Sequence, residues 1–211
     1  MIEVTLDAPW LTAQLIRPFR MLSWAPFNAG FITTDRIIWR EVRDADLTED
    51  FDALTWLSDS LTAMGKGDAI GMITSRDLAR FCLETACSGR IFATCLATVG
   101  LTNAERVGTR RCHRSLQPGT INLAVITNAT LSDTALIELS SIATQARTAA
   151  VMDHGPDLPT GRATGTGTDC IVVGAEAGNG QFAGLHTEVA EAVGAAVYRA
   201  VADGVVQWMA E

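Results

Sequence analysis

The segment Gly161-Arg162-Ala163-Thr164-Gly165-Thr166-Gly167-Thr168-Asp169 runs directly into the apolar residues Cys170-Ile171-Val172-Val173. If the segment is extended, its three threonines lie on one face, and Gly165, Gly167 and Asp169 lie on the other. Glycine packs nothing inside a strand, so two alternating glycines indicate a bulge or the close approach of another group to the backbone. The segment therefore predicts a strand that forms the floor of a ligand site. A kinked edge strand with solvated threonines is the alternative.

The composition indicates a globular protein with one compact domain over residues 1–211. Hydrophobic residues make up 48% of the chain and charged residues 19%, which argues against disorder. The net charge of −8 disfavours nucleic acid and anionic membrane surfaces as the main partners. A neutral or cationic ligand fits this charge better.

The first seven residues lack the basic start and apolar core of a signal peptide, so we expect a cytoplasmic protein. The most apolar segment, residues 189–209, is interrupted by charged side chains and predicts no membrane span. The cysteines are odd in number and lack C-x-x-C spacing, which predicts reduced, mostly buried thiols. They are Cys82, Cys87, Cys95, Cys112 and Cys170.

The order of the predicted elements suggests the fold class. Alternation and apolar spacing predict strands over 2–6, 11–17, 20–24, 36–42, 69–74, 90–99 and 119–127. The predicted helices cover 50–64, the segment from Ser75 to Gly89, the segment from Ser132 to about Gly155, and 188–209. Strands that gather early and later alternate with helices predict an α+β fold, a mixed α/β sandwich with helices packed on a largely antiparallel sheet.

His186 has the most suggestive context of the three histidines. Thr187 is a natural N-cap for the last helix, so His186 and Glu191 take the two positions that meet in a hydrophobic staple. A glutamate that accepts one ring N–H leaves the other nitrogen free as a base. The alternative is a histidine that only packs against the helix start. His113, among arginines, is expected in a solvated loop, and His154 is expected to contact the end of a helix.

Other signals of catalytic chemistry are weaker. Asp169 supplies a carboxylate beside threonine hydroxyls, but no G-x-S-x-G elbow, H-E-x-x-H motif or paired C-x-x-C occurs. The sequence therefore predicts neither a serine elbow nor a metal site. Asn28, in the tight loop Asn28-Ala29-Gly30, is either a turn residue or a ligand contact.

Four short segments in this order resemble the adenosylcobinamide amidohydrolase (CbiZ) family: 100–108, 119–122, 164–169 and 184–187. The resemblance extends from the Asn28 loop to the last helix. It implies a role in cobinamide salvage for coenzyme B12 synthesis. The amide between the aminopropanol arm and the corrin ring of adenosylcobinamide would be hydrolysed, giving adenosylcobyric acid and aminopropanol. No cofactor is implied beyond the cobalt that the corrinoid substrate carries, and a homo-oligomer is left open.

Under this resemblance we predict His186 as the base, oriented by Glu191, while Asp169 positions water or substrate and Asn103 holds the oxyanion. The side chains and glycines suited to a large amide-bearing substrate are Asn28, Arg106, Asn122, Gly165, Thr166, Gly167 and Thr168. Two alternatives are kept. One is a non-catalytic corrinoid-binding protein, and the other is a hydrolase or transferase of a different amide.

Overall fold

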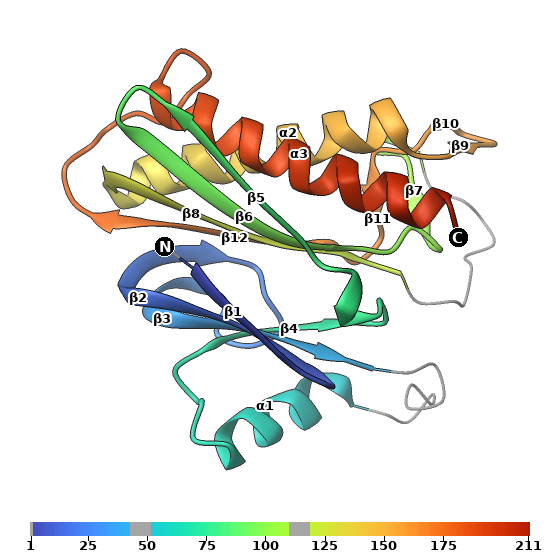
Figure 1. Ribbon diagram of the computed structural model, residues 1–211, viewed down its shortest axis with the longest axis horizontal. Coiled ribbons are helices and arrows are strands. Elements are labelled where there is room, and N and C mark those ends of the chain that lie inside the picture. The colour runs from blue at the N-terminus through green and yellow to red at the C-terminus, as the bar shows by residue number, and fades with distance from the viewer. Residues whose placement is uncertain (1, 43–51, 110–118) are drawn as a thin grey trace.

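The fold is known from a computed structural model that describes residues 2–42, 52–109 and 119–211. Its helices and strands stack in layers (Figure 1), with α2 and α3 over one side and α1 below the other. The helices are α1 (Ala53–Ala63), α2 (Asp133–His154) and α3 (Glu188–Met209). The long strands are β1 (Ile2–Asp7), β2 (Trp10–Ser23), β3 (Gly30–Glu41), β4 (Ile70–Thr74), β5 (Cys82–Ser88), β6 (Ile91–Val99), β8 (Ile121–Leu131) and β12 (Cys170–Ala177).

The sheet runs in the order β4-β3-β2-β12-β8-β6-β5, and β1 pairs with β2 off this path. Most pairs are antiparallel, and the β3–β4 and β8–β12 pairs are parallel. The register between β2 and β3 shifts between Gln14 and Phe19. β1 pairs with β2 before this shift and β12 pairs with it afterwards. One long strand therefore belongs to both strand layers of the sandwich. The predicted mixed α/β sandwich with a largely antiparallel sheet is confirmed.

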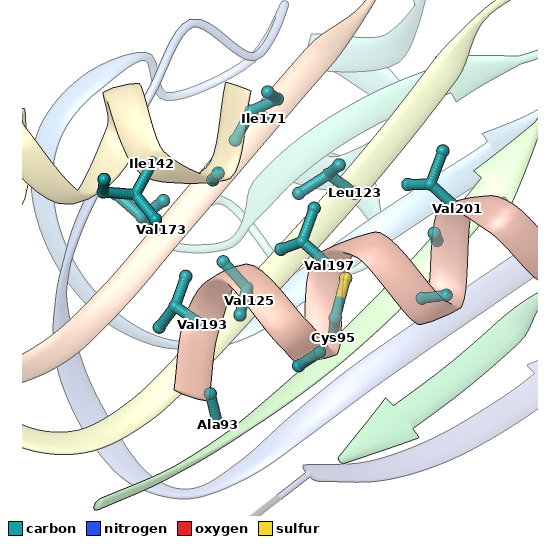
Figure 2. Packing of buried hydrophobic residues seen from close by; sticks show 14 of the residues in the cluster. Ala93, Cys95, Leu123, Val125, Ile142, Ile171, Val173, Val193, Val197 and Val201 are labelled. Carbon is teal, nitrogen blue, oxygen red and sulfur yellow. The ribbon is translucent and has the colours of Figure 1, made fainter. Parts of the chain in front are cut away.

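The core between the helices and the sheet is built from small and β-branched side chains. Figure 2 shows Val193, Val197 and Val201 of α3 over Cys95 of β6 and Val125 of β8. These valines recur every four residues, so they form one stripe along the helix. Every one of them is fully buried.

A second apolar core lies between the two strand layers. Leu11 and Met21 of β2 and Trp39 of β3 belong to the same cluster as Ala124 of β8 and Val172 of β12. A smaller cluster holds α1 against the outer strands through Leu57 and Leu61. Residues of β8 therefore alternate between the two cores, which is why this strand reads as an almost continuous apolar run.

Local sequence signals placed the two long helices correctly. Ser132 caps α2 by accepting from the Ala135 N–H, and Thr187 caps α3 by accepting from the Ala190 N–H. The predicted helix from Ser75 to Gly89 is wrong, because Cys82–Ser88 is strand β5, preceded only by the 3-10 turn Leu78–Arg80.

The remaining short strands lie in the loops that precede the long ones. They form two small pairs: β7 (Ala104–Glu105) with β11 (Gly165–Thr166), and β9 (Asp157–Leu158) with β10 (Gly161–Arg162). The expected continuous strand over 161–169 is therefore replaced by two short pieces. No helix within 2–42, 52–109 and 119–211 is long and apolar enough to cross a membrane.

Candidate active site

Polar side chains gather at the end of the sandwich where β6 ends and where β8 and β12 begin. In Figure 1 this is the end near β7 and β11, beside the C-terminus of α3. The β7–β11 pair joins residues 104–105 to residues 165–166. Gly100 donates its N–H to the Thr120 carbonyl, 3.0 Å away. Three of the four segments that carry the family resemblance therefore meet at one place.

Asp169 is the centre of this group. Its carboxylate accepts hydrogen bonds from the backbone N–H of Ile121 and of Thr166, both at 3.0 Å. It also accepts from the Thr166 hydroxyl and from the Arg147 guanidinium. The Asp169 side chain is 7% exposed and that of Arg147 is 11% exposed. A carboxylate offers about four lone-pair positions, so these four donors use its accepting capacity.

The ion pair between Arg147 and Asp169 packs directly against the backbone of Gly165. A Cβ on Gly165 would lie 2.6 Å from Asp169 Oδ2 and even closer to the Arg147 guanidinium. Only a residue without a Cβ leaves room for both groups. At Gly165, the close approach to the backbone that the glycine pattern predicted is made by Arg147 and Asp169.

A second set of hydrogen bonds joins the starts of β8 and β12. The Thr120 hydroxyl oxygen lies 2.8 Å from the Thr168 carbonyl oxygen and 3.0 Å from Asn122 Oδ1, and its single proton is donated to one of these two acceptors at a time. Asn122 in turn donates from Nδ2 to the Ile73 carbonyl of β4, 2.7 Å away. The Thr168 hydroxyl donates to the Gly119 carbonyl at 3.0 Å. These bonds connect the two strand layers at the polar end.

Asn103 lies against two glycines beside this network. A Cβ on Gly119 would come within 3.1 Å of Asn103 Oδ1 and 2.9 Å of the Thr102 backbone nitrogen. A Cβ on Gly167 would lie 4.0 Å from Asn103 Nδ2. No described residue accepts a hydrogen bond from this nitrogen, so Asn103 presents an amide donor beside Gly167.

Two hollows flank residues 165–169. The sheet-side hollow has a volume of about 440 Å³ and is lined by Trp24, Pro26, Leu54, Asn122, Gly167 and Thr168, with Asp169 and Cys170 beside them. The helix-side hollow, of about 320 Å³, is lined by Glu105, Arg106, Thr144, Arg147, Thr148 and Thr166. The sheet-side hollow combines polar groups with exposed apolar walls, since Trp24 is 49% and Leu54 is 58% exposed.

The sequence profile of the adenosylcobinamide amidohydrolase (CbiZ) family matches residues 2–211. The chain belongs to this family. A curated relative, the uncharacterized protein MJ1613 of Methanocaldococcus jannaschii, is 38% identical over 93 residues. That match spans 42% of this chain and 36% of the relative. Members of an amidohydrolase family act on amide bonds.

Two solved structures show a distant likeness. A beta-aminopeptidase of a Burkholderia species is 14% identical, with a TM-score of 0.43 over 95% of this chain and 78% of that one. The L-aminopeptidase D-Ala-esterase/amidase of Ochrobactrum anthropi is 12% identical, with a TM-score of 0.39 over 99% and 82% of the two chains. These superpositions are too loose to transfer the role of any residue.

The predicted pair of His186 and Glu191 does not form. Both side chains are exposed, and neither a hydrogen bond nor an ion pair joins them in the described part of the chain. The Glu191 carboxylate instead accepts from the Ser88 hydroxyl at 2.7 Å. His186 precedes α3, whose 22 residues extend about 33 Å toward the Asp169 end. His186 and Asp169 therefore lie toward opposite ends of the sandwich.

The other predicted residues divide between the two hollows and a turn. Asn122, Gly167 and Thr168 line the sheet-side hollow, while Arg106 and Thr166 line the helix-side one. Thr166 and Gly165 mainly serve the Asp169 network. Asn28 has a φ of 58° and donates to the Gly67 and Ala69 carbonyls, so its amide nitrogen holds a turn. His113 and Cys112 lie outside the described residues.

Arg147, Trp24 and Thr120 were missed by the sequence analysis. Arg147 is on α2, 22 residues before Asp169, and nothing in the helix pattern marks it. Trp24 donates from its indole nitrogen to the Asp169 carbonyl at 2.8 Å. Thr120 belongs to a segment that carries the family resemblance. Its hydroxyl, two residues before Asn122, is the sequence feature that could have identified it as a site residue.

The four cysteines in the described part of the chain do not supply a reactive group at the sheet-side hollow. Cys82, Cys95 and Cys170 are buried and Cys87 is exposed, and these four are free thiols. Burial, with a smaller contribution from the charge of Asp169, raises the pKa of Cys170 to about 12. Its thiol is therefore protonated at neutral pH and a poor nucleophile. Within 2–42, 52–109 and 119–211, no group of three His, Cys, Asp or Glu side chains is placed to hold a metal ion.

Proposed function

We propose that this protein hydrolyses the amide between the aminopropanol arm and the corrin ring of adenosylcobinamide. The products are adenosylcobyric acid and aminopropanol, which makes the reaction a step of cobinamide salvage. One observation supports the proposal: in this member of the amidohydrolase family, three of the four segments that carry the resemblance meet around the Asp169 network, and two of them, 119–122 and 164–169, line the sheet-side hollow.

The lining of the sheet-side hollow suits one edge of a corrinoid. A corrin carries amide side chains around a broad apolar ring, so it needs both hydrogen-bonding groups and apolar contacts. Asn122 and Thr168 provide polar groups at the floor, while Trp24 and Leu54 provide apolar surface at the rim. The volume of about 440 Å³ is that of a site for one arm of the substrate, with the ring outside.

Asn103 is placed to stabilise charge during hydrolysis. Addition of the water oxygen to the acyl carbon puts negative charge on the former carbonyl oxygen, and the aminopropanol nitrogen gains a proton as the C–N bond breaks. An amide N–H aimed at that oxygen lowers the barrier. We assign this donor role to Asn103 Nδ2, which lies beside Gly167 of the hollow.

Asp169 acts in this proposal by positioning other groups. Its carboxylate already accepts four hydrogen bonds, so it does not offer a free lone pair to take a proton from water. It fixes the starts of β8 and β12 and residues 165–168 relative to one another. The geometry of the sheet-side hollow depends on that fixation.

The experiment is to incubate the purified protein with adenosylcobinamide and to measure released aminopropanol and adenosylcobyric acid. The Asn103→Ala variant should lose about 10²–10³-fold in kcat with intact corrinoid binding. A matched control is Asn179→Ala, at an exposed loop position far from the hollow. Corrinoid binding without release by the wild type would instead indicate a non-catalytic corrinoid-binding protein. Release from other amides only would indicate a different substrate.

A further inference from the structure

The helix α1 supplies one wall of the sheet-side hollow through Leu54 in its first turn. Leu54 is 58% exposed and lines the hollow together with Trp24. Figure 1 shows α1 on the far side of β2, β3 and β4 from α2 and α3. A binding-site wall is only as precise as the element that carries it, so the contacts that hold α1 bear on how the hollow receives a ligand.

The middle and the end of α1 are held by an apolar stripe. Leu57 and Leu61 are fully buried in the small cluster against the outer strands. A Cβ on Gly71 would lie 2.7 Å from Leu61 Cδ1 and 3.3 Å from Leu57 Cδ2, so α1 packs closely on β4 at this point. Leu54 continues the stripe by its spacing but lies outside the buried cluster. A helix anchored along one stripe can still roll about it, so the orientation of the first turn depends on a further contact.

Arg40 of β3 makes that contact, because its guanidinium lies between two indole rings. Its Cζ is 4.8 Å from the ring centroid of Trp10 and 4.8 Å from that of Trp56. Trp10 is opposite Arg40 in the β2–β3 pair, whereas Trp56 belongs to α1. A guanidinium within about 6 Å of a ring centroid is attracted to the ring, and its planar shape allows it to stack. The stack therefore joins α1 to the sheet.

Trp56 and Leu54 leave α1 on different sides. Two residues along a helix are about 200° apart around its axis. A roll of α1 that separated Trp56 from Arg40 would therefore also move Leu54 relative to Trp24. The first turn is fully formed, since the Asp52 carboxylate accepts from the Leu54 N–H at 3.1 Å. Leu54 thus moves with the helix as one body.

We propose that Arg40 is a positioning residue for the corrinoid: its place between Trp10 and Trp56 fixes the roll of α1 and so holds Leu54 against the apolar edge of the substrate. This inference rests on the proposed function. Arg40 acts through Leu54 and not on the reacting amide.

The test compares Arg40→Lys with the wild type, because lysine keeps the positive charge and removes the planar group that stacks on both rings. With adenosylcobinamide, KM should rise at least about threefold and kcat should stay within about twofold, since only binding contacts are lost. Arg20→Lys is the matched control. The Arg20 guanidinium lies 5.1 Å from the Phe31 ring centroid and pairs with Asp133 at the start of α2, so KM should stay within about twofold.

A second substitution shows whether Arg40 acts through Leu54. Leu54→Ala should raise KM roughly tenfold by removing apolar contact with the substrate. Adding Arg40→Lys to Leu54→Ala should raise KM no further, because the side chain that Arg40 positions is already gone. Independent, additive increases would contradict the proposal.

Methyl NMR of Leu54 follows the wall without any substrate. The Leu54 signals should shift in Arg40→Lys, because the methyl groups move relative to the Trp24 ring, and should match the wild type in Arg20→Lys. Urea unfolding of each variant establishes that it is folded. Unchanged Leu54 signals in folded Arg40→Lys overturn the proposal.

The positioning role and the proposed function fail in different ways. Corrinoid binding by the wild type without release of aminopropanol would refute hydrolysis, and the Kd for adenosylcobinamide would then replace KM in the same comparison. Neither binding nor release would refute the corrinoid as the ligand and this inference with it. Equal KM values, or equal Kd values, for Arg40→Lys and Arg20→Lys overturn the role of Arg40 even where the wild type hydrolyses the substrate.

Discussion

The two ends of the sandwich carry similar kinds of polar residue in opposite situations. At one end, Asp169 is buried, and donors from β8, α2 and its own loop converge on it. At the other end, His186 and Glu191 are exposed, and their predicted contact does not form. The comparison shows that residue spacing within one segment can identify candidate site residues. A buried polar network, however, forms only where side chains from several segments meet. Four substitutions test this difference between the ends.

The largest effect is expected from Asp169→Asn. The amide removes the counter-charge of buried Arg147 and places an N–H donor where the carboxylate only accepted. Breaking a buried pair on one side costs about 3–5 kcal/mol. Urea unfolding should show this loss, while Asp157→Asn, whose carboxylate is 81% exposed in its pair with Arg162, should change stability by less than about 1 kcal/mol. Similar losses in both variants would mean that the Asp169 network does not hold this end together.

Gly165→Ala tests whether the Asp169 network depends on the close contact between its ion pair and the backbone. The added methyl group would meet the Arg147 guanidinium and Asp169 Oδ2, so the ion pair must shift. Overpacking of this kind costs about 1–3 kcal/mol. Gly67→Ala is the matched control, because a Cβ there meets nothing within 4 Å and should change stability by less than about 0.5 kcal/mol. Thermal unfolding of both variants measures the difference, and an unchanged midpoint for Gly165→Ala would contradict the close crossing.

The parts of the fold that sequence could predict are those with local causes. Ser132 and Thr187 stand directly before apolar stripes of helical period, so the starts of α2 and α3 were correct. β5 was predicted as a helix because Leu78, Phe81 and Cys82 have helix-like spacing. Its true partner is β6, reached through the turn at Gly89, whose φ is 56°. Strand pairing of this kind overrides local preference.

The candidate site was predictable only in part, for a related reason. Asn122, Thr166, Thr168 and Asp169 lie in short glycine-containing segments that mark close backbone approaches. Arg147 lies in the middle of α2, and an arginine on a helix normally indicates a solvated face. Its contact with Asp169 depends on how α2 packs over β11, which no local pattern encodes. His186 illustrates the converse, since a correct N-cap at Thr187 did not bring Glu191 to the imidazole.

Trp24→Ala compares apolar surface at the two ends. Trp24 is 49% exposed at the sheet-side hollow, and we expect its loss to raise KM for adenosylcobinamide roughly tenfold, because a large ring no longer packs against the corrin. Phe182→Ala removes an aromatic ring that is 75% exposed at the His186 end, and KM should stay within about twofold. Steady-state release of aminopropanol measures both. Equal effects would place the corrin elsewhere on the surface.

His186→Ala carries the smallest expected effect and decides between the ends. The imidazole is exposed and has no partner among the described residues. Its removal should therefore leave the free energy of unfolding essentially unchanged and kcat within about twofold of the wild type. A pH profile of kcat measured beside Asn103→Ala distinguishes the two residues, since loss of a base changes how kcat depends on pH, whereas loss of an oxyanion donor lowers kcat at every pH. If kcat fell by orders of magnitude while the free energy of unfolding stayed unchanged, His186 would be the general base, as the sequence analysis predicted. Because His186 and Asp169 lie toward opposite ends of α3, which is about 33 Å long, such a result would also require the amide to bind at the far end, with the Asp169 network having only a structural role.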